Sequence, residues 1–152
     1  MASNDTPKKI FLKGCPKGRE GLAAVAGILP GMLVEGVTGG DVVPHATAGG
    51  PAVPAFARPN EVIGKGIDDA YANGDTVLYG VVNSGDEVYG WIADGENIAA
   101  GDYLQSDGAG AFVAWVAGSA GTTLPGHAIA KAMQTVDNSA GGAPARMKLE
   151  VL

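Results

Sequence analysis

The stretch GDTVLYGVVNSGDEVYGWIADGENIAAGDYLQS, residues 74–106, decides the fold of this chain. It contains three copies of one pattern, in which Gly-Asp precedes a run of β-forming residues: 74–79, 85–92 and 101–106. Glycine suits a turn position that needs positive φ, aspartate accepts hydrogen bonds from turn amides, and alternating residues then pack one face of a sheet. Pro30-Gly31-Met32-Leu33-Val34 is a looser fourth copy. The copies are too unevenly spaced for a solenoid, so they favour a compact sandwich or barrel of short strands.

Segments on both sides of this stretch extend the β pattern. Short apolar runs separated by Gly, Pro and Asp predict strands joined by tight turns. An internal proline makes 53–57 an edge or irregular strand. The other expected strands are 22–28, 32–37, 42–45, 111–116, 128–136 and 147–152, with a hairpin turn at 107–110 and a C-terminal hairpin formed by the last two. Residues 66–74 are the expected helical turn, with Asp68 as its cap and Gly74 as its terminator.

Length and composition indicate one small domain that is mainly β. The chain has 152 residues, of which 25 are glycine and 9 are proline, a combined fraction below that of disordered chains. No apolar run is long enough to span a membrane, and residues 1–7 are too polar for a secretion signal, so we expect no membrane partner. A single cysteine, Cys15, excludes an internal disulfide and is consistent with a reducing compartment.

Charge is distributed unevenly along the chain. Residues 1–19 hold five basic residues and one acidic residue, a net charge of +4, whereas the other 133 residues carry a net charge of −10. The whole chain is acidic, at −6, which argues against nucleic acid as a partner. This division predicts a basic N-terminal arm, residues 1–19, attached to a β-rich domain, residues 20–152.

The arm contains an apolar triplet between lysines, which would be poorly placed on a free tail. Such a segment gains affinity by pairing with the sheet edge of a partner, where lysines also contact acidic groups. A frayed terminus with solubilising lysines is the alternative explanation. The predicted partner-binding residues of this arm are Lys8, Lys9, Ile10, Phe11, Leu12 and Lys13.

No residue pattern indicates an active site. Cys15 with His45 or His127 is the only pairing of a nucleophile with a base, and neither histidine stands in a catalytic motif. One cysteine and two isolated histidines do not supply the ligands of a metal site. The paired carboxylates match no calcium-binding loop and are better explained as solvated turn residues. We therefore predict no enzymatic activity, no catalytic residues, no metal site and no cofactor.

The two tryptophans suggest an alternative function. Trp91 and Trp115 would form a sugar-stacking face if both were exposed, which would make the protein a particle-displayed glycan-binding module for attachment to a host surface. Each tryptophan nevertheless lies within an apolar strand, and core packing or a subunit interface is the simpler explanation.

Residues 64–75, 85–97 and 101–108, together with the run from Pro125 to Asp137, carry a resemblance to a known family. They resemble the head decoration, or capsid cement, proteins of tailed bacteriophages, and the likeness extends from about residue 8 to the C-terminal residue. The resemblance implies a β-tulip or β-clip fold of the lambda type, a small barrel or sandwich with short helical turns and an extended N-terminal arm. Such proteins sit on the assembled shell, commonly as trimers, and the arm reaches across neighbouring capsid subunits.

These expectations combine into one hypothesis. The protein would be a structural virion protein, made in the host cytoplasm and located on the outer capsid surface. It would bind the major capsid protein and bridge its subunits as a homo-oligomer, with a trimer favoured by analogy. A structure in which this arm folds tightly into its own molecule, with Ile10 and Phe11 sealed inside, would undercut the capsid-cement hypothesis itself. A small enzyme that uses Cys15, or a β-clip domain of a larger sugar-acid enzyme, is the remaining alternative.

Overall fold

The computed structural model describes residues 6–118 and 126–152, and 40% of the chain lies in strands against 2% in helical turns. The mainly β fold predicted from the sequence is confirmed. No helical turn in these ranges is long or apolar enough to cross a membrane. The elements are β1 (Phe11–Lys13), β2 (Lys17–Leu22), β3 (Val34–Gly36), β4 (Val42–Pro44), β5 (Ala55–Arg58), the 3₁₀ turn η1 (Glu61–Ile63), β6 (Thr76–Val81), β7 (Glu87–Ile92), β8 (Asn97–Ile98), β9 (Tyr103–Ser106), β10 (Phe112–Ala114), β11 (Ala130–Ala132), β12 (Val136–Asp137) and β13 (Ala145–Val151).

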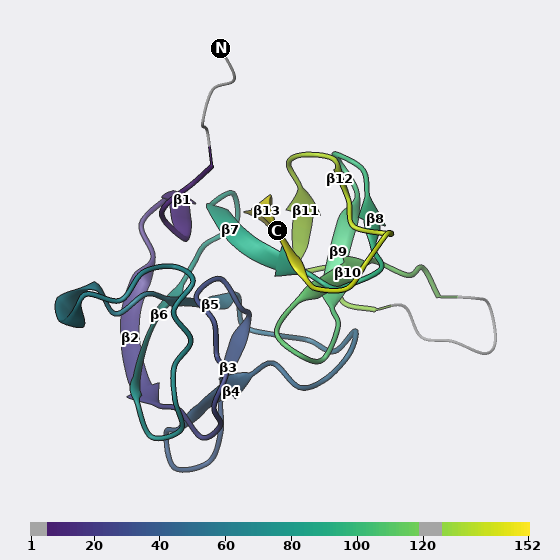
Figure 1. Ribbon diagram of the computed structural model, residues 1–152. Helices are drawn as coiled ribbons and strands as arrows, with labels where there is room; N and C mark the ends of the chain where they lie inside the picture. Colours follow the sequence, from purple (N-terminus) through teal and green to yellow (C-terminus); the bar gives the residue numbers. More distant parts are fainter. Residues whose placement is uncertain (1–5, 119–125) are drawn as a thin grey trace.

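Five strands close into a mixed β-barrel (Figure 1). Their order around the barrel is β7, β10, β9, β11 and β13, and β13 returns to pair with β7. The pairing of β10 with β7 is parallel, whereas the other pairings around the ring are antiparallel. β1 is the extra strand and pairs with β7 alone among the described strands.

β13, which closes the barrel by pairing with β7, alternates as the sequence predicts. Its inward side chains are buried, while those between them face outward and are only partly covered. The inward residues are Met147, Leu149 and Val151. The expected C-terminal hairpin is confirmed, since β11 pairs antiparallel with β13. The hairpin turn at 107–110 is confirmed too, because β9 and β10 pair across it.

Strands β2 to β6 form a smaller region beside the barrel (Figure 1). β2, β6 and β5 make a three-stranded sheet with β5 at one edge, as expected for the proline-containing segment. β3 and β4 form the predicted strand pair. A separate apolar cluster fills this region, made of Ala23, Ile28, Val34, Val42, Ala55, Ala57, Tyr71 and Val77.

The Gly-Asp turns have the geometry that the sequence predicts. In each turn the aspartate carboxylate accepts a hydrogen bond from the amide three residues earlier, at 2.8–2.9 Å, and its own amide donates to the carbonyl of that residue at 3.1 Å. The preceding glycines have φ of 84–96°. The three aspartates are Asp75, Asp86 and Asp102. These bonds fix each strand start locally, which explains why one pattern recurs before several strands.

The looser fourth copy forms the same turn with sulfur in place of the carboxylate. The Met32 amide donates to the Leu29 carbonyl at 3.1 Å, and the Leu29 amide lies 3.4 Å from Met32 Sδ. Gly31 has a φ of 93°. The turn at residues 29–32 is therefore a fourth member of the set, built with a weaker acceptor.

Two predicted elements are wrong. Residues 66–74 form non-helical turns in which the Asp69 carboxylate, and not Asp68, accepts from the Gly66 amide at 2.7 Å. The helical turn of the described chain lies earlier, at η1. Residues 22–28 do not form a strand, because β2 ends at Leu22 and single bridges follow at Ala23 and Ile28.

The β5–β6 loop, which contains η1, is attached to the outside of the barrel by Arg146. Its guanidinium donates to Asp68 Oδ1 at 2.8 Å, to the Pro30 carbonyl at 2.9 Å and to the Ile67 carbonyl. It also lies 4.3 Å from the centre of the Trp91 ring. The Arg146 side chain is only 7% exposed, and this burial lowers its pKa, which the Asp68 charge partly offsets.

Candidate docking surface

The segment predicted to be a free arm is part of the folded body. Ile10 is 2% exposed and belongs to the barrel core, and its carbonyl accepts a hydrogen bond from the Tyr89 amide at 2.7 Å. Phe11 packs half-buried against the same core. Burial of a side chain of this size contributes about 1.5–3 kcal/mol, and the barrel of the same molecule supplies the site.

The predicted boundary at residue 19 is corrected accordingly. β1 joins the barrel sheet through β7, and β2 joins the three-stranded sheet through β6. From Ile10 onward the chain thus belongs to the β-rich domain. Residues 1–5, the start of the predicted arm, lie outside the described residues.

The same segment nevertheless lines a wide groove on the surface of the described residues. This basic groove has a volume of about 480 Å³ and is lined by Pro7, Lys8, Lys9, Phe11, Leu12, Lys13, Glu87 and Lys148. Four lysines against one glutamate give its walls a net charge of +3, in a chain whose net charge is −6. Its floor is apolar at Phe11 and Leu12. A groove of this composition suits an acidic, partly apolar surface of another protein.

One lysine of the basic groove is neutralised within the molecule. Lys13 Nζ donates to Glu87 Oε1 at 2.8 Å, and this hydrogen bond, followed by the charges of Glu87 and Glu150, raises the pKa of Lys13. Lys8, Lys9 and Lys148 form no ion pair with any described residue. These three ammonium groups remain available to an acidic partner.

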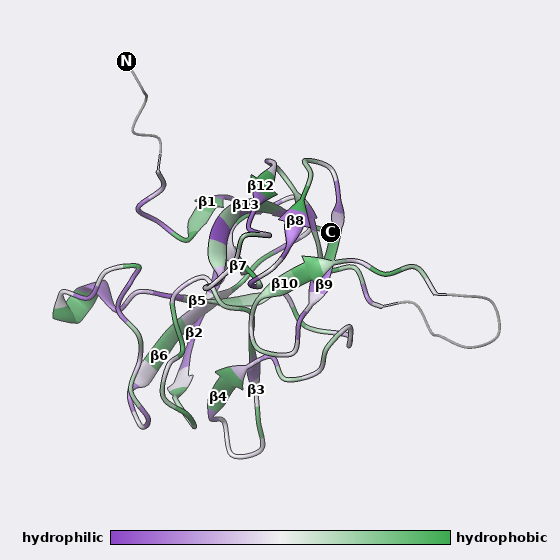
Figure 2. Ribbon diagram, turned by 45° about the vertical axis from the view of Figure 1, so that its right-hand side comes forward, coloured by the Kyte–Doolittle hydropathy of each residue, from purple (hydrophilic) through white to green (hydrophobic). Residues whose placement is uncertain are grey.

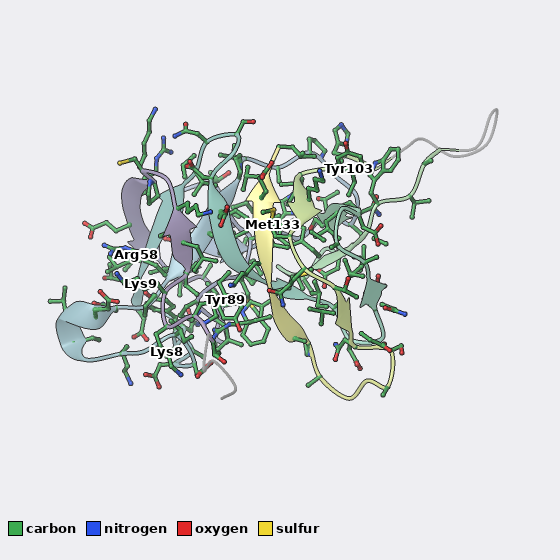
Figure 3. The ribbon with its side chains drawn as sticks, turned by 90° about the horizontal axis from the view of Figure 1, so that it is seen from above. Lys8, Lys9, Arg58, Tyr89, Tyr103 and Met133 are labelled. Carbon is green, nitrogen blue, oxygen red and sulfur yellow. The ribbon has the colours of Figure 1, made fainter. Side chains whose placement is uncertain are left out.

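A second recess continues the positive surface toward the η1 loop. It has a volume of about 230 Å³, shares Lys9 and Phe11 with the basic groove, and adds Arg58 and Glu61. Figure 3 shows Lys8, Lys9 and Arg58 on the same side of the molecule. Residues that are far apart in sequence therefore form one cationic face around β1.

Both histidine side chains contact groups other than Cys15. His45 is buried, with Nδ1 2.7 Å from Ser106 Oγ and Nε2 3.2 Å from the Pro51 carbonyl oxygen. His127 Nδ1 lies 3.2 Å from the Gly49 carbonyl oxygen. Cys15 is exposed in the turn between β1 and β2. His45 thus links the end of β4 to β9, which is a structural role.

The carboxylates of the described residues serve mainly as turn acceptors. Besides the Gly-Asp turns, Asp107 accepts from the amides of Ala109 and Ala111 at 2.7 and 3.0 Å. Asp94 accepts from the Gly142 amide at 2.7 Å. Residues 6–118 and 126–152 contain no group of three or more His, Cys, Asp or Glu side chains that could hold a metal ion.

The tryptophans do not form a shared stacking face. The Trp91 N–H donates to the Pro30 carbonyl at 2.9 Å, and Arg146 covers its ring. The Trp115 N–H donates to the Gly126 carbonyl at 2.6 Å, and its ring meets that of Tyr103 edge-on at 6.4 Å. Both indoles are half-buried. Each indole thus has its N–H bonded to a backbone carbonyl and its ring against a neighbouring side chain.

Four charged residues of this surface were not identified from the sequence: Arg58, Glu61, Glu87 and Lys148. The sequence contains an indication only for Lys148, because the alternation of residues 147–152 predicts that its side chain faces outward. Its position beside the N-terminal lysines depends on β7, which pairs with both β1 and β13. That pairing is set by barrel closure and has no local sequence pattern.

No protein-family model matches this chain, and no curated protein matches its sequence. The resemblance to capsid decoration proteins therefore depends on the sequence segments alone, residues 64–75, 85–97, 101–108 and 125–137.

Proposed function

We propose that this protein is a structural virion protein that binds the outer surface of a bacteriophage capsid and bridges subunits of the major capsid protein. The observation that carries the proposal is the basic groove, which has a net charge of +3 on an acidic chain. A localised charge of sign opposite to the rest of the molecule steers and orients an encounter with an acidic surface. The resemblance to decoration proteins of residues 64–75, 85–97 and 101–108, together with the run from Pro125 to Asp137, suggests the identity of the partner.

The burial of Ile10 counts against the free arm on which the sequence-based hypothesis depended, so the proposal now depends on the basic groove, where Phe11 is only half-buried. Because Ile10 is buried and β1 is paired with β7, residues 10–13 contribute a fixed wall and not a flexible strap. A preformed groove loses less conformational entropy on binding than a disordered arm, so fewer contacts are needed for the same affinity. Lys8 and Lys9, which are exposed, provide the charge at the rim.

Because a capsid presents many identical binding sites, the protein can stabilise the shell even if each copy binds weakly. A groove of this size makes a modest contact, but many copies that each join adjacent subunits add their contributions over the whole shell. Assembly as a homo-oligomer, with a trimer favoured by the resemblance, multiplies the contacts again. The protein would then stabilise the shell without performing any chemistry.

The test is co-sedimentation of the purified protein with expanded empty heads. The variant Lys8→Glu/Lys9→Glu reverses two charges at the groove, and Lys17→Glu/Lys65→Glu makes the same charge change at exposed lysines outside it. We expect occupancy by the groove variant to fall about tenfold or more near 0.1 M salt, and the control to bind like the unaltered protein. Equal binding by both variants would overturn docking through the groove, and no binding by the unaltered protein would overturn the capsid function.

A further inference from the structure

A pocket in the smaller region brings together charged groups that the capsid function does not use. It has a volume of about 330 Å³, and small-molecule sites begin at about 300 Å³. It shares no lining residue with the basic groove or with the recess beside that groove. We call it the inter-sheet pocket, and its lining includes Arg19, Glu35, His45, Ala55, Tyr79 and Val81.

The first wall of the inter-sheet pocket is one face of the three-stranded sheet. Arg19 of β2 and Tyr79 of β6 are paired across the two strands, so their side chains lie next to each other on this face. Val81, two residues further along β6, is on the same face and is paired with Ala55 of β5. Arg19 forms no ion pair with any described residue. This wall therefore combines an available cation and a phenol with an apolar surface.

The second wall comes from β3 and the segment after β4. Figure 2 shows β3 and β4 beside the sheet of β2, β6 and β5, as in Figure 1. Glu35 Oε1 accepts from the Ala46 amide at 3.1 Å, whereas Oε2 lies 3.9 Å from His45 Nε2, too far for a hydrogen bond. Arg19 and Glu35 line one pocket without pairing with each other. The described residues thus leave a positive and a negative group separated in the same pocket.

His45 holds the second wall in a fixed position. Its side chain is 2% exposed. In the neutral ring, Nε2 donates to the Pro51 carbonyl at 3.2 Å, because a carbonyl oxygen can only accept, and Nδ1 accepts from the Ser106 hydroxyl at 2.7 Å. Ser106 Oγ in turn accepts from the Gly108 amide at 3.1 Å. This chain of bonds attaches the wall to β9 of the barrel, so the pocket is preformed and loses little entropy when it binds a ligand.

We propose that the inter-sheet pocket binds a small zwitterion, a molecule with a carboxylate and an ammonium group on an apolar body, such as a free amino acid with an apolar side chain. The Arg19 guanidinium suits a carboxylate because its N–H groups donate in pairs, and the Tyr79 hydroxyl adds a donor. Glu35 Oε2 accepts from the ammonium group, and Val81 and Ala55 contact the apolar body. This site goes beyond the capsid function and does not depend on it.

The volume of the pocket sets the size of this ligand. A cavity of about 150 Å³ holds benzene, so a pocket of about 330 Å³ has room for the ring of phenylalanine together with its charged end. A ligand with a single charge would satisfy only one of the two walls. We therefore expect the pocket to prefer a zwitterion over an acid or an amine with the same ring.

The test is an NMR titration of the purified protein with three related compounds. L-phenylalanine carries both charged groups, hydrocinnamate lacks the ammonium group and phenethylamine lacks the carboxylate. We expect L-phenylalanine to shift the amide signals of residues 34–36 and 79–81, with a Kd of about 1 mM or lower. Each analogue should bind about fivefold more weakly, because it loses one charge-assisted hydrogen bond.

Two substitutions assign each charged group of the ligand to its wall. Arg19→Gln should weaken L-phenylalanine and hydrocinnamate about fivefold and leave phenethylamine unchanged. Glu35→Gln should weaken L-phenylalanine and phenethylamine and leave hydrocinnamate unchanged. The controls Lys65→Gln and Glu20→Gln remove the same charges at exposed positions outside the pocket and should bind like the unaltered protein.

Three results would each overturn the proposal: no shift of the pocket signals at about 10 mM L-phenylalanine, equal affinity for the three compounds, or L-phenylalanine binding that neither substitution weakens. The comparison of compounds uses the unaltered protein, so it decides the question even if a variant does not fold. Co-sedimentation with heads is a separate measurement on a separate surface, so failure of either proposal leaves the other standing.

Discussion

The barrel and the smaller region of β2 to β6 have hydrophobic cores of different composition. The barrel cluster contains large side chains with no exposed surface, including Ile92, Leu104, Phe112 and Leu149. The cluster of the smaller region consists largely of alanine and valine, with Ile28 and Tyr71 as its largest members. Stabilisation by burial scales with apolar area, so each residue of the smaller region contributes less.

Polar links compensate for the small core of this region. Tyr71 ties the ends of the η1 loop, Arg146 attaches that loop to the barrel, and His45 reaches Ser106 of β9. The comparison teaches that the barrel depends on packing, whereas the smaller region depends on specific hydrogen bonds and on Leu33 and Phe56, which it contributes to the barrel cluster. Hydrogen exchange should accordingly be faster in β2–β6 than in β7, β9 and β13.

The largest expected effect comes from a matched pair of cavity substitutions. Ile92→Ala in the barrel and Ile28→Ala in the smaller region each remove the same atoms from a site with 0% exposure. Such changes cost about 2–5 kcal/mol, and the cost depends on how far the surroundings collapse into the space. We expect Ile92→Ala near the upper end and Ile28→Ala near the lower end, because loops beside Ile28 can relax. Urea unfolding measures both. An equal or larger loss at Ile28 would contradict the distinction between the two cores.

Arg146 provides the next test, because it joins the two regions. Arg146→Ala removes hydrogen bonds to two carbonyl groups and the contact with Trp91, and we expect a loss of about 2–3 kcal/mol in the free energy of unfolding. Arg146→Lys should recover less than half, because a single ammonium group cannot reach three oxygens in the plane of a guanidinium.

Asp68→Asn is the control for this substitution. The Asp68 carboxylate is 86% exposed, so its ion pair with Arg146 is screened by water and should contribute less than about 1 kcal/mol. Hydrogen exchange in residues 59–70 should accelerate in Arg146→Ala and change little in Asp68→Asn. Unchanged exchange in both variants would show that Arg146 does not hold the loop.

The sequence was sufficient where structure is determined locally. The Gly-Asp turns combine a positive-φ glycine with a carboxylate that binds an amide three residues away, so a short window contains the whole interaction. The strands at 42–45 and 147–152 were found for the same reason, since alternation or a flanking glycine turn identifies them. The mainly β barrel followed from these elements together.

The sequence was insufficient where a partner lies far along the chain. Charge indicated that Lys8 and Lys9 are exposed but gave no information about which surface receives Ile10, which packs in the barrel core. The basic groove needs Lys148, brought to residue 13 through β7. The displaced helical turn has the same origin, because Arg146 fixes residues 67–68 from the opposite end of the chain.

The smallest expected effect tests the hydrogen bonds that stabilise the smaller region. Tyr71→Phe removes a hydroxyl that donates to the Arg58 carbonyl at 2.6 Å and accepts from the Leu78 amide at 3.3 Å, while the ring remains in the apolar cluster. We expect a loss of about 1 kcal/mol, measured by urea unfolding at neutral pH. Phenylalanine at the exposed Tyr103 is the matched control and should cost less.

This hydroxyl also predicts a pH dependence with a definite sign. Burial raises the pKa of Tyr71 above its ordinary value, so the folded protein binds the phenolic proton more tightly than the unfolded chain. The corresponding stabilisation is fully present below the ordinary tyrosine pKa and is lost as pH rises through the raised one. Stability should therefore fall above about pH 10, and Tyr71→Phe should reduce the slope of that fall. An unchanged slope would mean that another group governs alkaline unfolding and would contradict the raised pKa of Tyr71 as its cause.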